Sequence, residues 1–221
     1  MARMARVVIP GLPHHVTQRG NRRQQTFFCD KDYSDYIRLM ATACRQTGTR
    51  VWAYCLMPNH VHLVMVPTSE DGLRGAVANA HRRYSHMINQ RFGWRGHLWQ
   101  ERFFSNPMDE SYLRSTVRYV EMNSVAAGLC DVTSAWQWSS ARAHLMRRND
   151  DLVDVAPMLG RVDDWQSFIA TPVEPDTAKT ISAHLRTGRP LGHKAFVQSL
   201  EELTERPLQP AKRGPKPRLG S

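Results

Sequence analysis

The feature that most constrains the fold is an apolar, β-branched run that contains two histidines one residue apart. The run His60–Val66 lies between Pro58 and Pro67, and its composition predicts a buried strand. Because strand side chains alternate between faces, His60 and His62 are expected to point to the same side. Two neighbouring imidazoles on an apolar sheet are costly unless they are used, so this arrangement favours metal binding. A lone histidine would be better interpreted as an ordinary core residue.

The surrounding pattern places this strand in an α+β fold. We predict, in chain order, a strand over 14–18, a helix over 30–47 with Asp30 as N-cap, strands over 51–57 and 60–66, a helix over 71–92 and a strand over 97–108. This β-α-β-β-α-β order predicts a ferredoxin-like antiparallel sheet with two helices on one face. The other face is expected to be free for a ligand.

The remainder of the chain predicts helices and a basic tail. A further helix is expected over 109–123, with Asp109 as its N-cap. We divide the chain into a main domain over 1–148, a small helical C-terminal region over 149–206 and a disordered basic tail over 207–221. Part of this tail resembles an AT-hook, which would place basic side chains in the minor groove of DNA.

The charge pattern favours a polyanionic partner. The formal net charge is +10, and arginine outnumbers lysine by 25 to 5. A GC-rich genome explains part of that bias, but the excess gathers in three unbalanced stretches, which favours distributed phosphate contacts. The candidate nucleic-acid contacts are Arg19, Asn21, Arg22, Arg82, Arg83, Arg213, Lys216 and Arg218.

The cysteine pattern and hydropathy suggest a reducing compartment. The four cysteines show no C-x-x-C pair, so buried thiols are expected rather than a disulfide framework. Neither a signal peptide nor a long apolar span is present. We therefore expect a cytoplasmic protein that makes no membrane contact.

A phenol and an amide are spaced to meet the histidine pair. Tyr119 and Asn123 lie four residues apart in a predicted helix and therefore share a face. If that helix packs near His60 and His62, three neutral ligands would hold Mg²⁺ or Mn²⁺ with positions open for phosphate oxygens. A phenol with a pKa near 10 attacks phosphorus only when it is positioned and deprotonated. An ordinary half-buried aromatic is the alternative for Tyr119, and Tyr112 lies on nearly the same face.

Four segments together resemble the REP-associated tyrosine transposases, single-tyrosine relatives of the HUH-type transposases that act on single-stranded DNA. These segments are HHVTQRGN (14–21), YCLMPNHVHL (54–63), RYVEMNSVAAGL (118–129) and WSS (138–140). The resemblance implies that His60, His62 and Asn123 are the metal ligands. It also implies that Tyr119 is the nucleophile, which leaves a 5′-phosphotyrosine and a free 3′-OH. Substrates would be hairpin-forming palindromic repeats at the bacterial nucleoid.

The chain departs from this family directly after the predicted catalytic helix. The family usually has Asn-Pro-Val-Arg-Ala-Gly, whereas this chain has Asn123-Ser124-Val125-Ala126-Ala127-Gly128. The predicted ligand Asn123 is kept, so an intact metal site is still expected. Ser124 and Ala126 replace the proline and the arginine. The loss of proline concerns how the helix ends, and the loss of arginine removes one candidate phosphate contact.

Three functions stay open on this evidence. The first is a strand transferase that nicks and rejoins single-stranded DNA at hairpins. The second is a metal-dependent nuclease that uses an activated water, with Tyr119 only structural. The third is a non-catalytic DNA-binding regulator with a vestigial site. The joint presence of four candidate site residues argues against it, namely His60, His62, Tyr119 and Asn123. A monomer and a homodimer are both compatible with the sequence.

Overall fold

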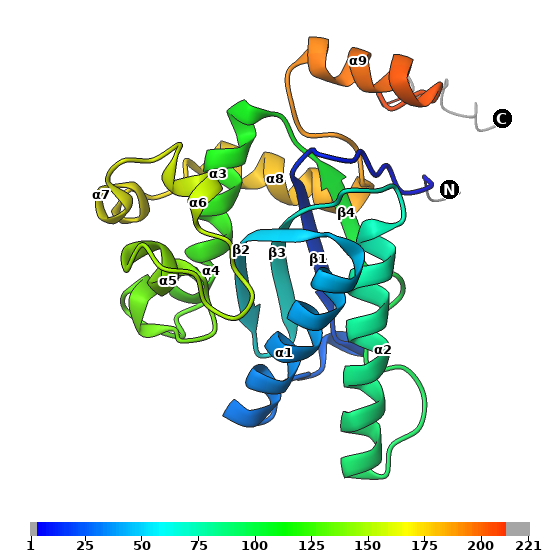
Figure 1. Ribbon diagram of the computed structural model, residues 1–221, viewed down its shortest axis with the longest axis vertical. Helices are drawn as coiled ribbons and strands as arrows, with labels where there is room; N and C mark the ends of the chain where they lie inside the picture. The colour runs from blue at the N-terminus through cyan, green and yellow to red at the C-terminus, as the bar shows by residue number, and fades with distance from the viewer. Residues whose placement is uncertain (1–3, 211–221) are drawn as a thin grey trace, which may run out of the picture.

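A four-stranded antiparallel sheet forms the centre of the computed structural model, which describes residues 4–210 (Figure 1). The strands are β1 (His14–Arg19), β2 (Arg50–Met57), β3 (His60–Val66) and β4 (Phe104–Pro107). Their spatial order is β2-β3-β1-β4, and every neighbouring pair is antiparallel. This order confirms the predicted ferredoxin-like topology.

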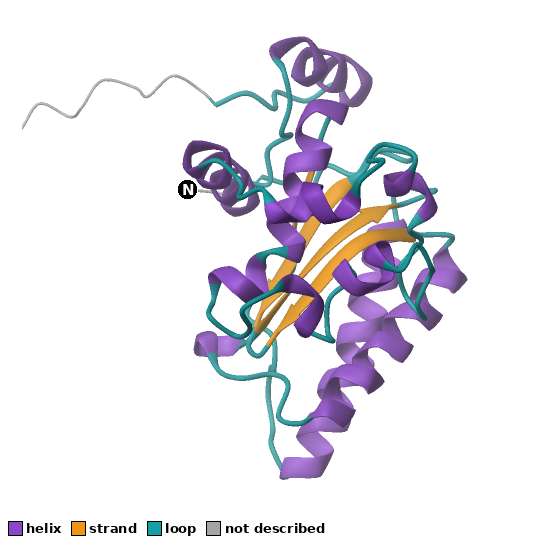
Figure 2. Cartoon of the chain, turned by 90° about the vertical axis from the view of Figure 1, so that its left-hand side faces the viewer, coloured by secondary structure: helices purple, strands orange, loops and turns teal. Residues whose placement is uncertain are grey.

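Two long helices cover one face of the sheet. Figure 2 shows α1 (Asp30–Thr47) and α2 (Gly72–Phe92) together on one side of the strands. Alternate residues of β3 point to them, and Val61 and Leu63 are fully buried in the core beneath the helices. The N-cap of α1 is Cys29 rather than the predicted Asp30, because the side chain of Asp32 accepts hydrogen bonds from the backbone before it.

The second face of the sheet is not free, contrary to our expectation. The helix α3 (Glu110–Glu121), capped by Asp109 as predicted, packs across β2 and β3. It buries the strand residues that face away from α1 and α2, among them Cys55 and Val64. The shorter elements that follow or connect are η1 (Asn21–Arg23), α4 (Asn123–Ala126), η2 (Thr133–Ala135), α5 (Ala141–Leu145), α6 (Ala156–Leu159), α7 (Trp165–Ala170), α8 (Pro175–Thr187) and α9 (Lys194–Thr204).

The residues after 148 pack on the sheet and the N-terminal segment. Val153 bridges to Val51 of β2, and α8 contacts β4 and β1. The helix α9 packs with the N-terminal segment, and Leu208, which follows it, is 1% exposed. Leu208, for which the sequence predicted a place in the basic tail, is therefore packed with α9 and the N-terminal segment. Arg213, Lys216 and Arg218 lie outside the described residues, and within 4–210 no helix is long and apolar enough to cross a membrane.

The last strand is shorter than the sequence suggested. We predicted a strand over 97–108, but the extended pairing covers only β4, and the segment before it is a loop with one bridge from Gly20 to Trp99. Leu98 and Trp99 are both buried, and the Trp99 ring stacks on His81 of α2 with 4.4 Å between ring centroids. Packing of the Trp99 ring against α2, rather than ladder pairing, fixes this segment, so tertiary packing overrides the β propensity here.

Candidate functional site

A cavity of about 560 Å³ opens at one end of the second sheet face, between β1, β3, α3 and α8. It is lined by Thr17, Arg19, Arg23, His60, His62, Gln100, Glu101, Phe104, Tyr119, Asn123, Ser182, Leu185 and Arg186. The two histidines, the tyrosine and the asparagine singled out in the sequence all belong to this set. The structure therefore brings residues of β3 together with Tyr119 of α3 and Asn123 of α4. The periodicities predicted which residues share a face, and the packing of the tyrosine helix near β3 was the condition for their meeting.

The two histidines on β3 share a face and are held in their neutral forms. His62 pairs with Thr17 of β1 and Cys55 of β2, so it lies within the sheet and is only 5% exposed. Burial, with a smaller contribution from the charge of Arg19, lowers the pKa of His60 to about 4. Burial and the neighbouring basic groups hold the pKa of His62 well below its usual range. Neutral imidazoles keep a lone pair available for a metal ion near neutral pH.

A separate polar partner orients each imidazole. The Nδ1 of His60 lies 2.6 Å from the side-chain oxygen of Asn59. Because that oxygen can only accept, Nδ1 carries the proton, and the Nε2 lone pair of His60 is free for a ligand. The Nδ1 of His62 lies 3.0 Å from Nε2 of His15 on the neighbouring strand β1. When His62 donates in this pair, its Nε2 is also free.

His15 lies in the HHVTQRGN segment that resembles the family, and the sequence assigned it no role. It is completely buried, and burial lowers its pKa to about 3, so its ring is also neutral. Its Nδ1 has no hydrogen-bond partner among the described residues. The period of two along β1 could have placed His15 on the face of His62, but only the strand order shows that the two rings meet.

Tyr119, near the end of α3, and Asn123, at the start of α4, both reach the cavity. The Tyr119 ring is edge-on to His62 with 5.8 Å between ring centroids. Burial raises the pKa of Tyr119, and the charge of Arg19 partly offsets this effect. The side-chain NH₂ of Asn123 donates to the backbone oxygen of Tyr119 at 2.6 Å, which leaves the Asn123 side-chain oxygen available. Tyr112 does not line the cavity, so the two tyrosines of α3 are distinguished by position.

The donor set fits a divalent cation that accepts both nitrogen and oxygen ligands. Within residues 4–210 no group of three or more His, Cys, Asp or Glu side chains is placed to hold a metal. An ion at the histidine pair would therefore depend on the amide oxygen of Asn123 for a third protein ligand. An amide oxygen suits Mg²⁺ or Mn²⁺ and imidazoles suit transition metals, so the mixed set fits Mn²⁺ better than Mg²⁺.

A buried carboxylate fixes the end of α3 that carries Tyr119. Glu121 is fully buried, and three side chains donate to its carboxylate. These donors are Ser140 Oγ at 2.6 Å, His144 Nδ1 at 2.7 Å and Trp165 Nε1 at 3.1 Å. Ser140 also accepts from the backbone N–H of Tyr54 on β2 at 2.9 Å. The Trp-Ser-Ser segment of the sequence thus ties the tyrosine helix to the sheet.

The helix end is well formed even though Ser124 and Ala126 stand where the family usually has proline and arginine. The helix α3 ends at Glu121, Met122 keeps helical dihedral angles, and α4 continues from Asn123. Ser124 is fully buried, and its hydroxyl has no partner in the part of the chain that the structure describes. The turn then closes at Gly128, whose φ of 67° is a left-handed conformation suited to glycine.

Three arginines surround the cavity. Arg19 comes from β1, Arg23 from η1 and Arg186 from α8, and within residues 4–210 none of the three forms an ion pair. Arg19 was predicted as a nucleic-acid contact, whereas Arg23 and Arg186 were not. Arg23 had a signal in the basic turn beside Arg22. No sequence pattern pointed to Arg186, because its position depends on how α8 packs.

The other predicted contacts lie apart from the cavity. Asn21 and Arg22 belong to η1 but do not line it, and Arg22 is exposed. Arg82 and Arg83 are exposed on α2, on the opposite side of the sheet. These four residues stay predicted contacts to DNA, but not to the reacting phosphate.

Comparisons with known proteins show which family the chain belongs to and which solved structures share its fold. The profile of the family described as "Transposase IS200 like" matches residues 9–123. A Haemophilus influenzae protein named "Putative REP-associated tyrosine transposase" is 26% identical in an alignment of 123 residues that covers 48% of this chain and 69% of that protein. A solved REP-associated tyrosine transposase bound to a REP hairpin shares the fold with a TM-score of 0.58 and 21% identity, covering 71% of this chain and 94% of that chain.

Proposed function

Since the chain belongs to the IS200-like transposase family, we propose that it nicks and rejoins single-stranded DNA through a covalent bond to Tyr119. The observation that carries this proposal is the shared cavity of the histidine pair, Tyr119 and Asn123 with three arginines that have no ion pair within the described residues. A phenol, a candidate metal site and phosphate-binding cations are the parts that this reaction requires.

In the proposed step, the phenol oxygen of Tyr119 attacks a phosphorus atom of the DNA backbone. A bond forms between the tyrosine oxygen and phosphorus, and the bond from phosphorus to the 3′ oxygen breaks. The phenol loses its proton, and the departing 3′ oxygen gains one, which leaves a 5′-phosphotyrosine and a free 3′-OH. Because the new linkage is still a phosphodiester, attack by another 3′-OH can rejoin DNA without ATP.

The remaining residues of the cavity bind and orient in this proposal. His60 and His62, through their Nε2 atoms, and Asn123, through its side-chain oxygen, would hold Mn²⁺ or Mg²⁺. A divalent ion bound there would act as a Lewis acid toward the scissile phosphate. Arg19 and Arg186 would neutralise the phosphates on either side.

The proposed substrate is a hairpin formed by a palindromic repeat in single-stranded DNA. The structurally similar transposase was solved with such a hairpin bound, and the net charge of +10 suits a DNA partner. Repeats of this kind would be met at the bacterial nucleoid.

A denaturing gel tests the proposal. Incubation of the protein with an end-labelled single-stranded hairpin and Mn²⁺ should give a slow band in which DNA is attached to protein. Tyr119→Phe should abolish this band, whereas Tyr112→Phe, on the same helix but outside the cavity, should keep it. Nicked DNA without an adduct would instead support a nuclease that uses water. Binding without nicking would support a regulator.

A further inference from the structure

We infer that exposed aromatic rings at the end of α2 form a stacking platform for unpaired bases of the DNA strand that leads to the cavity. The platform consists of Phe28, Phe92 and Trp94. This inference rests on the proposed function for the identity of its ligand, single-stranded DNA. It assigns those bases to a surface outside the cavity described above.

The three rings lie against one another at the molecular surface. Phe92 is 41% exposed and Trp94 is 43% exposed, although large aromatic side chains are normally buried. Their rings are stacked, with 4.7 Å between centroids and an interplanar angle of 21°. Phe28 completes the group at 4.8 Å from Phe92 and 5.7 Å from Trp94. Exposed rings of this kind bind nucleic-acid bases of any sequence by stacking.

The backbone holds Trp94 in place. Gly93 ends α2 in the left-handed conformation, with φ of 65°, and turns the chain back across the helix end. The backbone N–H of Trp94 donates to the carbonyl of Asn89 at 2.8 Å. The side chain of Asn89 in turn donates to the carbonyl of Gly96 at 2.9 Å. A ring held in this way loses little further freedom when a base stacks on it.

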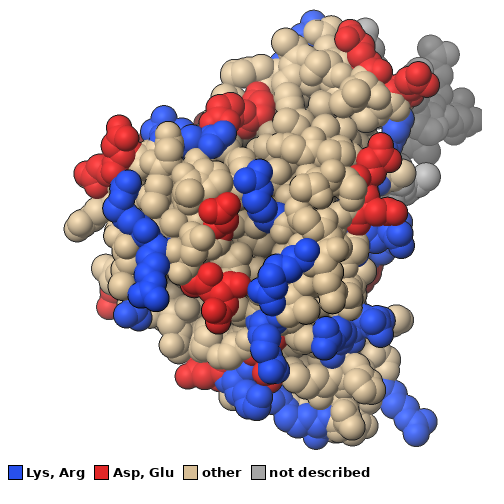
Figure 3. Space-filling view, viewed as in Figure 1, with Lys and Arg blue, Asp and Glu red and all other residues tan. Residues whose placement is uncertain are grey.

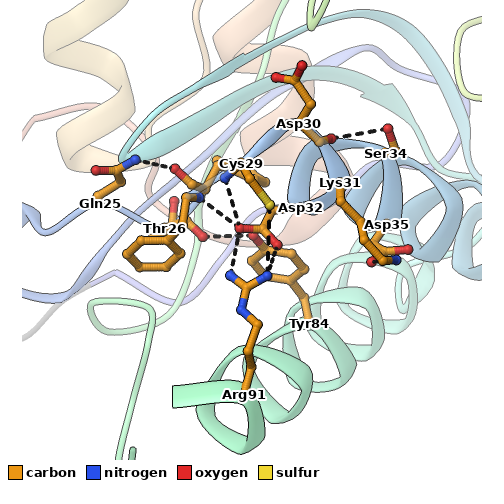
Figure 4. A network of polar contacts seen from close by, with 12 residues as sticks. Gln25, Thr26, Cys29, Asp30, Lys31, Asp32, Ser34, Asp35, Tyr84 and Arg91 are labelled. Atoms are coloured by element: carbon orange, nitrogen blue, oxygen red, sulfur yellow. Dashed lines mark hydrogen bonds and ion pairs between the residues drawn. The ribbon is translucent and has the colours of Figure 1, made fainter.

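An ion pair between Arg91 and the buried carboxylate of Asp32, which Figure 4 shows, holds two rings of the platform. The guanidinium of Arg91 donates to both carboxylate oxygens of Asp32 at 2.6 and 2.8 Å, and the Asp32 side chain is completely buried. The same carboxylate accepts from the backbone N–H of Phe28 at 2.8 Å. Arg91 also lies 4.7 Å from the centre of the Phe92 ring. One salt bridge therefore positions two of the three rings.

One short segment of the chain links the platform to the wall of the cavity. The chain runs directly from Arg19 and Arg23, which line the cavity, to Phe28, and this segment contains no acidic residue. Hydrogen bonds from the backbone of Gly20, Thr26 and Phe27 to the β2–β3 turn hold the segment beside the start of β3. A strand with its phosphate at Tyr119 would therefore meet a basic path and then the rings.

Charge favours nucleic acid over a second copy of this chain as the occupant. Arg95 is exposed and directly follows Trp94, and Figure 3 shows mainly Lys and Arg side chains over the lower part of the molecule, where α1 begins and α2 ends in Figure 1. Two copies meeting through this surface would bring like charges together, whereas DNA phosphates would neutralise them.

Fluorescence anisotropy with EDTA, which prevents cleavage, tests the platform by binding alone. The probes are a blunt hairpin, the same hairpin with a single-stranded extension, and a short oligothymidylate. Trp94→Ala should weaken binding of the extended hairpin and of the oligothymidylate about tenfold. It should leave the blunt hairpin within about twofold. Phe92→Ala should behave alike, and Trp94→Phe should recover most of the affinity because it restores a ring.

The control is Leu203→Ala, which removes a 66% exposed apolar side chain from α9 and should change none of the affinities. Equal weakening for all three probes, or no weakening, would overturn the platform. The platform would also be overturned if Trp94→Ala lost a dimer, measured by light scattering, without a change in DNA binding. Ring-dependent oligothymidylate binding by a protein that forms no tyrosine adduct would uphold the platform and refute the proposed chemistry.

Discussion

Each imidazole of the β3 pair is oriented by a different group, so a substitution of one such group is expected to affect one histidine directly. His60 relies on the adjacent Asn59, whereas His62 relies on His15 from a neighbouring strand. Alternation along a strand was sufficient to predict that His60 and His62 share a face. It could not identify His15, because that contact depends on β1 lying beside β3, which is a property of the assembled sheet.

We expect His15→Gln to weaken Mn²⁺ binding by about 10- to 100-fold, because removing a group that orients a metal ligand usually has this effect. Isothermal titration calorimetry on the folded protein measures the change. His14→Gln is the matched control, since His14 is equally buried but hydrogen-bonds to the N-terminal segment. Equal affinities in the two variants would contradict the orienting role of His15.

The helix α3 directs Tyr119 into the cavity, and a buried carboxylate anchors its last turn. The N-cap Asp109 and the i, i+4 spacing of Tyr119 and Asn123 were visible in the sequence and are as predicted. The donors to Glu121 were not, because they come from two separate segments that follow α3: Ser140 and His144 at α5, and Trp165 in α7. A helix as short as α7 has too few turns for a reliable periodicity.

We expect Glu121→Ala to destabilise the fold by about 3–5 kcal/mol, because it leaves three buried donors unpaired and opens a cavity. Urea unfolding followed by circular dichroism measures this change. Glu110→Ala is the control at the other end of α3, because the Glu110–Arg161 pair is at the surface and should contribute at most about 1 kcal/mol. Similar losses in both variants would refute the anchoring role.

The N-terminus of α1 predicts a pH-dependent contribution to stability. Burial raises the pKa of Asp32, but hydrogen bonds from Arg91 and the backbone, with the Arg91 charge, outweigh burial and lower it overall. A lowered carboxyl pKa gives stability that is present above the unfolded value near 3.9 and is lost as the pH falls through the folded value. Asp32→Asn should therefore cost about 2 kcal/mol at pH 7 and progressively less below about pH 4. A difference independent of pH would contradict this assignment.

The whole molecule differs most from the sequence prediction on the second face of the sheet. The order of the long elements, and hence the ferredoxin-like topology, follows from strong hydrophobic periodicity. The packing of α8 over the cavity could not be predicted, because no local pattern specifies which face a distant amphipathic helix covers. As a result, Arg186 is a wall residue that the sequence did not reveal.

We expect Arg186→Ala to weaken hairpin binding and to reduce the slope of log affinity against log salt by nearly one, as loss of one phosphate contact requires. A salt titration of DNA binding measures that slope. Arg148→Ala, an exposed arginine outside the cavity, should leave the slope unchanged. An unchanged slope in Arg186→Ala would exclude a phosphate contact at this wall.

The central claim is that Tyr119 becomes covalently bound to DNA, and mass spectrometry of the trapped adduct tests it most directly. After nuclease and trypsin digestion, the nucleotide mass should lie on the peptide spanning residues 119–142, in which Tyr119 is the sole tyrosine. The same mass on the peptide spanning 103–114, which carries Tyr112, or on neither peptide, would contradict the account.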